Sequence, residues 1–144
     1  MDPNATFART LLKITFGLVP IVAGLDKFFN LLTDWNQYVP KFLAGLLPIG
    51  TGTLLAIVGI IEIAAGILVF IRTRLGAYVV SAWLVLIALS LISTGDYLDI
   101  AVRDFVMAIA ALSLAKLSEA HSRIPSASGK ASSSLKNKRG HVTV

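Results

Sequence analysis

The chain has 144 residues, of which 56% are hydrophobic, and its mean hydropathy is +0.79. This composition is too apolar for a soluble domain of this size, so we expect the lipid bilayer to surround the protein. The absence of cysteine excludes disulfides, thiolate metal sites and iron–sulfur clusters. The net charge of +5 is explained by membrane topology and a basic tail, so no nucleic-acid partner is expected.

Four apolar stretches predict an all-α membrane protein, an up-down bundle of four transmembrane helices. Each stretch is close to the length of about 20 residues that a helix needs to cross a bilayer, and none alternates like a barrel strand. The bundle occupies residues 9–120 after a polar lead of residues 1–8, and its spans cover about 14–32, 49–71, 75–93 and 98–115. We expect the first span to be retained and not cleaved as a signal peptide.

The positions of lysine and arginine predict that both termini are cytoplasmic. These residues are retained on the cytoplasmic side of a membrane, and four spans place both termini and the turn at residues 72–74 on one side. All lysines and arginines lie on that side except Lys27, Lys41 and Arg103. The expected location is therefore the cell (inner) membrane.

The connections between the spans differ in length. Residues 33–48 combine Trp35, Tyr38 and Pro40 with a second apolar run, which is typical of an interfacial helix or a re-entrant segment. A plain amphipathic loop is the alternative. Only residues 72–74 separate the second and third spans, so these two helices should be antiparallel neighbours.

Glu62 is the one charged residue in the apolar stretch from residue 49 to residue 71. At 1.5 Å per residue it lies about 20 Å from the outer end of this span and about 14 Å from the inner end, near the midplane. A charge at this depth costs about 2.5 kcal/mol or more, so the carboxyl should face protein or water and be either paired or protonated. Glu62 is the main candidate for an intramembrane functional residue.

Glycines indicate which way Glu62 faces. Glycine recurs every seven residues along the second span and the segment before it, and Glu62 shares the glycine face because it lies three or four residues from its neighbours in the series. Small residues on one face let another helix approach closely, and the first span carries a similar face. We therefore predict that Glu62 points into the bundle and that five glycines pack the helices: Gly17, Gly24, Gly52, Gly59 and Gly66.

Four charged residues are predicted to form an outer charge cluster: Asp26, Lys27, Arg103 and Asp104. Each lies about 8 to 9 Å inside the outer end of its span, so two acids and two bases neutralise one another if the first and fourth spans are adjacent. The cluster is either an interhelical lock or a binding site for a polar head group, such as that of a quinone or an anionic small molecule. From the cytoplasmic half, the expected neighbours of Glu62 are Lys13, Tyr78, Ser81 and Ser113.

The sequence carries no catalytic signature and no metal-binding motif. No spacing specifies a nucleophile with its base, a metal site or a phosphate loop, and both histidines, His121 and His141, follow the last span. Residues 121–144 are rich in Ser, Gly and Lys, so we expect a basic, disordered cytoplasmic tail.

Several of these elements together resemble the DoxX-like family of four-helix integral membrane proteins. The resemblance lies in residues 24–28 (GLDKF), residues 59–70 (GIIEIAAGILVF), the basic turn at residues 72–74 and the Arg103-Asp104-Phe105 sequence that opens the fourth span. It covers about residues 9–117. The Gly-x-x-Glu-x-x-x-Gly element and the Arg-Asp pair are its distinctive parts.

The resemblance implies a bacterial or archaeal membrane protein. Some DoxX-like proteins are small subunits of thiosulfate:quinone oxidoreductases or belong to membrane oxidoreductase complexes, and many have no assigned activity. Carried over to this chain, the family pattern marks Lys27, Glu62, Arg103 and Asp104. The chain departs from the family by its long basic tail and its lack of cysteine, which argues against thiol or sulfur chemistry by this chain alone.

Three functions are compatible with the sequence. The first is a subunit of a membrane oxidoreductase assembly that anchors partner proteins and contributes to quinone binding or proton uptake, with no cofactor of its own. The second is a non-catalytic structural or assembly protein, with protein partners or as a homo-oligomer. The third is a small proton or solute carrier, which is less favoured because carriers typically contain discontinuous helices at the midplane.

Overall fold

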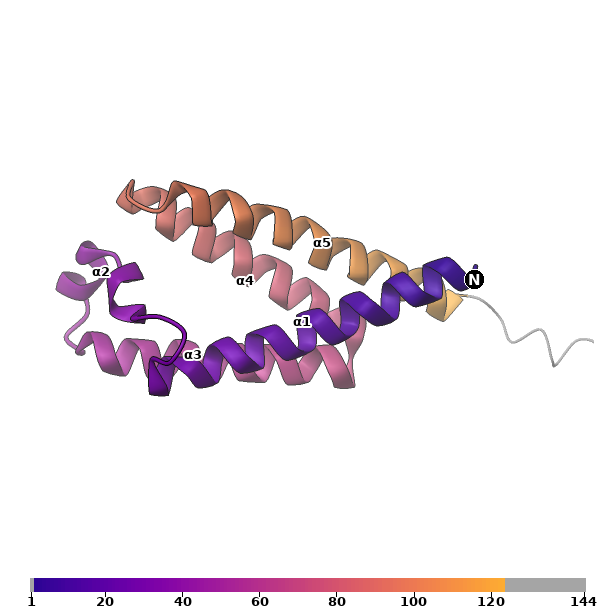
Figure 1. Ribbon diagram of the computed structural model, residues 1–144, viewed down its shortest axis with the longest axis horizontal. Coiled ribbons are helices and arrows are strands. Elements are labelled where there is room, and N and C mark those ends of the chain that lie inside the picture. Colours follow the sequence, from indigo (N-terminus) through magenta and orange to yellow (C-terminus); the bar gives the residue numbers. More distant parts are fainter. Residues whose placement is uncertain (1, 124–144) are drawn as a thin grey trace, which may run out of the picture.

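The computed structural model describes residues 2–123, which are all-helical and contain no strand. Figure 1 shows the order of the elements, which are α1 (Pro3–Phe29), the 3-10 helix η1 (Trp35–Tyr38), α2 (Lys41–Leu46), α3 (Thr51–Ile71), α4 (Thr73–Thr94) and α5 (Leu98–Arg123). Helix α5 continues through residues 121–123, where the disordered tail was predicted to begin. The remainder of that predicted tail lies outside the described residues.

Three of the helices, α1, α3 and α4, are long and apolar enough to cross a membrane. Helix α1 begins at Pro3, before the predicted first span, and ends at Phe29, three residues before the predicted end of that span at residue 32. Proline is favourable at the start of a helix, where its missing N–H has no partner to lose. At the other end, Asn30 adopts the left-handed conformation and its N–H bonds to the carbonyl of Asp26, a common helix stop.

The helices pack as two pairs, α1 with α3 and α4 with α5. Figure 1 shows the pairs converging beside the N-terminal half of α1 and separating toward the far ends, where η1 and α2 lie. A single residue, Arg72, joins α3 to α4. The prediction that these two helices are antiparallel neighbours is therefore confirmed.

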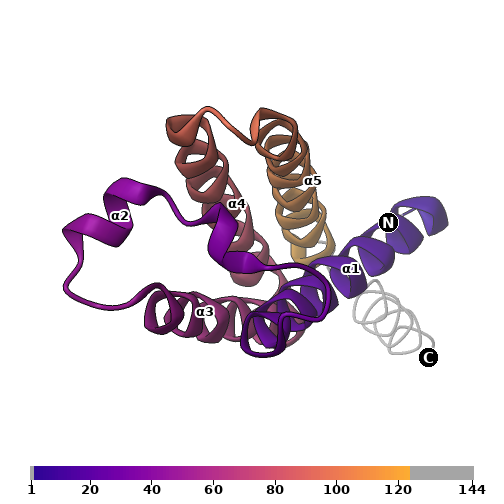
Figure 2. The same cartoon turned by 60° about the vertical axis from the view of Figure 1, so that its left-hand side comes forward.

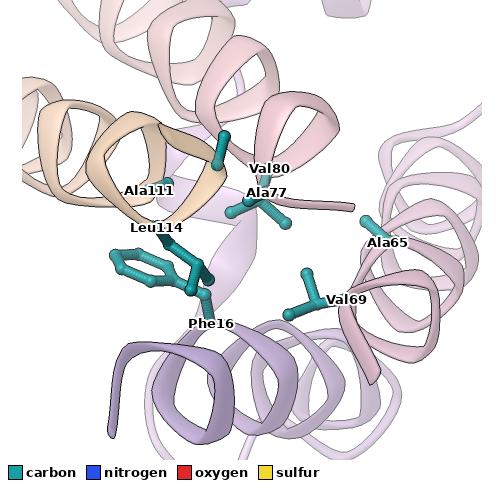
Figure 3. Close-up of a cluster of buried hydrophobic side chains, with 8 residues drawn as sticks. Phe16, Ala65, Val69, Ala77, Val80, Ala111 and Leu114 are labelled. Carbon is teal, nitrogen blue, oxygen red and sulfur yellow. The ribbon is translucent and has the colours of Figure 1, made fainter. Parts of the chain in front are cut away.

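The main hydrophobic core lies where the two pairs converge. Figure 3 shows side chains from α1, α3, α4 and α5 meeting there. Val69 and Leu114 are fully buried in this core, and small residues around them allow the helices to approach closely. The cluster consists of Phe16, Ala65, Val69, Ala77, Val80, Ala111, Leu114 and Ala115.

Glycines on α1 and α3 bring these helices into backbone contact. A Cβ atom added at Gly24 would lie 2.5 Å from the carbonyl oxygen of Gly59, and one added at Gly66 would lie 2.5 Å from that of Gly17. The packing role predicted for these four glycines is confirmed. The same prediction is wrong for Gly52, which has no neighbouring atom within 4 Å, because α1 ends before it reaches the first turn of α3.

A polar cluster ties α4 to α5 at the converging end. The Tyr78 hydroxyl donates to Glu119 Oε1 over 2.7 Å, and Arg74 and Lys116 lie 3.2 and 3.4 Å from the same carboxylate. Arg9 of α1 donates to the Ser118 hydroxyl beside them. This cluster accounts for Tyr78, which was expected beside Glu62.

The Glu119 carboxylate should make the stability of this end dependent on pH. Hydrogen bonding by Tyr78 is the largest influence that lowers the pKa of Glu119 below its ordinary 4.5, and Lys116 and Arg74 act in the same direction. A lowered pKa in the folded state means that the ionised form stabilises the fold. This stabilisation is present in full when the pH is above the ordinary pKa of Glu119, and it is lost as the pH falls through the lowered pKa of the folded state.

We therefore expect Glu119→Gln to reduce the melting temperature of the detergent-purified protein at pH 7, and the difference from the wild type to narrow below pH 4.5. Circular dichroism at a series of pH values measures both. Lys116→Gln is the control and should change little, because exposed ion pairs contribute little to stability. A difference between Glu119→Gln and wild type that is constant with pH would contradict the prediction.

Candidate functional site

Glu62 forms a buried ion pair with Lys27 of the neighbouring helix α1. Lys27 Nζ lies 2.6 Å from Glu62 Oε2, and the two side chains are only 5% and 8% exposed. The Trp83 indole N–H, from α4, points at the other carboxylate oxygen over 3.4 Å. The prediction that Glu62 faces the bundle is confirmed, and of the two predicted states, paired or protonated, the structure has the paired one.

The glycine contact explains why these two charges meet. Because α1 and α3 are antiparallel and touch at Gly24 and Gly59, Lys27 lies directly beside Gly59, with its Cβ 3.5 Å from where a Cβ of that glycine would be. A helical side chain leans toward the N-terminus of its own helix. The lysine therefore extends along α3 by about one turn and reaches Glu62.

Asp26, the neighbour of Lys27 in sequence, has a different set of partners. Its carboxylate accepts hydrogen bonds from the backbone N–H groups of Leu31 and Leu32, at 2.9 and 3.0 Å, and from the Trp35 indole at 2.7 Å. These bonds satisfy amides just past the end of α1. They also hold the Trp35 ring over Lys27, with Nζ 3.7 Å from the ring centroid, in a cation–π contact.

A cavity of about 930 Å³ lies between the two helix pairs, with the ion pair in its wall. Its volume is that of a site for a sizeable small molecule. The lining is mostly apolar, from residues such as Pro20, Leu55, Ile87 and Met107. Charged and indole groups also face it, namely Lys27, Trp35, Glu62, Trp83, Arg103 and Asp104.

The predicted outer charge cluster is wrong in its pairing. Among residues 2–123, no salt bridge joins Asp26 or Lys27 to Arg103 or Asp104. The reason is that α1 packs mainly against α3 and approaches α5 chiefly at the converging end. Three of the four charges nevertheless share a cavity, since Lys27, Arg103 and Asp104 all line it.

The expected cytoplasmic neighbours of Glu62 are also wrong. Ser81 donates to the carbonyl of Ala108 and Ser113 to that of Ile109, while Tyr78 bonds to Glu119. Lys13 is not among the polar partners of Glu62, which are Lys27 and Trp83. The carboxylate takes its partners from residues 27 and 83, on the side of the open end of the bundle.

The sequence interpretation missed two tryptophans that belong to the site. Trp35 was placed in an interfacial or re-entrant segment, and Trp83 was not among the predicted site residues. The available signal was that an indole N–H in an apolar environment needs an acceptor, and the chain has two tryptophans and few intramembrane carboxylates. That rule indicates a bond to some carboxylate without saying which one.

The arrangement suits recognition of a polar head group with an apolar remainder. Ammonium, guanidinium and indole groups offer donors, and two carboxylates offer acceptors, within an otherwise apolar lining. No group of three or more His, Asp or Glu side chains that could hold a metal ion occurs in residues 2–123. No protein-family model matches the chain, and searches of the curated proteins and of the solved structures find no match either.

Proposed function

We propose that the protein is a DoxX-like integral membrane subunit of an oxidoreductase-type assembly, in the cell membrane of a bacterium or archaeon. Two observations support this. Sequence elements around Lys27, Glu62 and Arg103 resemble that family, and these three residues line one cavity. In this proposal α5 is the fourth spanning helix, both termini are cytoplasmic, and the protein anchors partner subunits.

The surface of α5 supports its place in the bilayer. Val102, Val106 and Ile109 are 64%, 60% and 66% exposed, and Leu98 and Leu112 extend the same stripe at spacings of three and four residues. A continuous apolar stripe of this kind fits a helix that faces lipid. The charges near its start, at Arg103 and Asp104, line the cavity.

Within the assembly, we propose that the cavity binds the head group of a quinone. The observation that carries this proposal is the buried Lys27–Glu62 pair in the wall of a large apolar cavity. Lys27 offers a hydrogen-bond donor to a quinone carbonyl oxygen, and a carboxyl group at this position suits proton transfer to it. Reduction to the quinol takes two electrons and two protons, and the electrons come from a partner subunit.

Quinone binding should be visible in the fluorescence of the two tryptophans, because Trp35 and Trp83 both line the cavity. Titration of decylubiquinone into the detergent-purified full chain is expected to quench this fluorescence saturably. In Lys27→Met/Glu62→Leu, binding should weaken about tenfold or more, because hydrogen bonds to charged groups are lost. Glu119→Gln, outside the cavity, is the matched control and should bind as the wild type does.

Linear, non-saturating quenching that is the same in all three proteins would overturn the quinone proposal. The role of a partner has its own measurement. Reduction of decylubiquinone by the purified chain with a soluble electron donor, without any other subunit, would contradict the dependence on a partner. Purification from native membranes should instead recover the chain together with a redox subunit.

The same residues favour a second candidate function, a non-catalytic structural or assembly protein. Gly24 and Gly59 bring α1 and α3 into backbone contact, and the Lys27–Glu62 pair joins the same two helices. In that case the pair serves only to hold the helices together. Co-purification with partner proteins or a homo-oligomer, combined with an absence of quinone binding, would favour this function.

A further inference from the structure

The outer strap, which we define as residues 30–50 between α1 and α3, crosses the open end of the bundle. It contains η1 and α2, and Figure 2 shows η1 lying in front of the space between the two helix pairs. Trp35, Tyr38, Pro40 and Leu43 of the strap all line the cavity. The strap therefore forms the outer wall of the site that contains the ion pair.

Two side-chain contacts connect the strap to the two helix pairs. On one side, the Trp35 indole donates to Asp26 at the end of α1. On the other side, the Tyr38 ring meets Tyr97, just before α5, edge to face with 4.8 Å between the ring centroids. The strap thus spans from the α1/α3 pair to the α4/α5 pair.

Apart from the amides of Leu31 and Leu32, which bond to Asp26, and the buried Pro40, the remainder of the strap is weakly held. Neither η1 nor α2 contains a buried residue, and the backbone bonds of η1 are long, at 3.4 and 3.3 Å. Short 3-10 helices have poor hydrogen-bond geometry. Segments with little burial are the ones that open at low cost while the rest of a fold stays intact.

Trp35 also links the strap to the ion pair. Its N–H bonds to Asp26 while its ring covers Lys27 Nζ at 3.7 Å, and that same Nζ lies 2.6 Å from Glu62. A displacement of the strap therefore uncovers the ammonium group on the side that faces the cavity.

We propose that the outer strap is a gate to the cavity and that Trp35 is its latch. Opening the strap releases the Asp26 bond and the Lys27 contact together, and a planar, hydrogen-bond-accepting head group enters from the outer membrane interface to replace the ring. The identity of the head group rests on the proposed function, whereas the gate itself is measured without any ligand.

Cysteine labelling tests the gate, because the natural chain contains no cysteine. Ser90→Cys places one thiol in the cavity lining, on α4. Its reaction with a charged, membrane-impermeant maleimide is followed in the detergent-purified full chain. Trp35→Phe keeps an aromatic ring over Lys27 but removes the N–H bond to Asp26, and it should speed the labelling of this thiol by about tenfold, since a bond to a charged acceptor is lost.

Three comparisons make the result specific. Gln37→Ala removes a bond internal to the strap, to Thr33, and should leave the labelling rate unchanged. Ser93→Cys, on the exposed end of α4, should react equally fast in every variant and corrects for reagent activity. Tyr38→Leu frees the other side of the strap and should also speed the labelling of Ser90→Cys.

An unchanged rate in Trp35→Phe, with the protein eluting as a single species of wild-type helicity, would overturn the proposal. If Trp35→Phe does not fold, Tyr38→Leu decides in the same way. No quinone is present in this assay, so its outcome and that of the quinone titration are independent. If the strap does not gate the cavity, the labelling rate is unchanged in Trp35→Phe, whereas if the cavity does not bind quinone, the fluorescence quenching is not saturable. The failure of either proposal can therefore be recognised separately.

Discussion

Lys27→Met should destabilise the protein by about 3–5 kcal/mol, because it leaves the Glu62 carboxylate buried without its partner. The Lys27 and Glu62 side chains are only 5% and 8% exposed, so the carboxylate would lose its partner while most of it stays out of contact with solvent. The remaining polar partner, the Trp83 indole, is 3.4 Å from the carboxylate. That bond is too long to compensate for the lost charge.

The double variant Lys27→Met/Glu62→Leu should recover most of this loss. Replacing both members of a buried pair by apolar residues is often neutral, since the cost of desolvating two charges disappears with their attraction. Thermal unfolding of wild type, both single variants and the double variant in one detergent gives the coupling between the two sites. Additive losses would show that the two side chains do not form a pair in the folded protein.

Gly24→Ala and Gly59→Ala should each destabilise the protein by about 1–3 kcal/mol, because the added methyl group has no space. At Gly24 it would lie 2.5 Å from the carbonyl oxygen of Gly59, and at Gly59 it would lie 2.7 Å from the carbonyl oxygen of Gly24. Both obstacles are backbone atoms, so no side chain can rotate away. The helices must move apart, which also separates Lys27 from Glu62.

Gly52→Ala is the matched control for the glycine prediction. It makes the same substitution in the same helix as Gly59, but no atom lies within 4 Å of the new methyl group. The expected change is neutral or a gain of up to about 1 kcal/mol, from the better helix propensity of alanine. Equal melting temperatures for Gly52→Ala and Gly59→Ala would show that α1 and α3 do not touch at residue 59.

Apolar length and the glycine pattern were sufficient to predict the helices and the direction of Glu62. A carboxylate three residues after Gly59 and four before Gly66 has to share their face, and that face meets α1. The prediction extended to Gly52 because periodicity carries no information on where the neighbouring helix stops. Helix α1 ends where Asn30 adopts the left-handed conformation and where Asp26 accepts hydrogen bonds from the amides of Leu31 and Leu32.

The partner of Glu62 could not be chosen from the sequence. Counting from the ends of the apolar stretches placed Lys27 at the depth of Arg103 and well away from Glu62, because such a count treats the two span ends as level and ignores the reach of the lysine side chain along α3. Which helices form pairs was a second unknown, since depth alone favours no neighbour. The relative depth of the residues and the choice of helix pairs both depend on packing. For α1 and α3, the contact between Gly24 and Gly59 determines the register.

The single-residue connection at Arg72 makes the converging end a pivot. Helix α3 extends about 30 Å from this point to Thr51, so a rotation of about 5° there moves its far end by about 3 Å. Such a rotation hardly disturbs the core around Val69 and Leu114, which lies beside the pivot. A small tilt of one helix pair against the other is thus amplified at the end of the bundle where η1 and α2 lie, while the surface beside Arg72 stays almost in place.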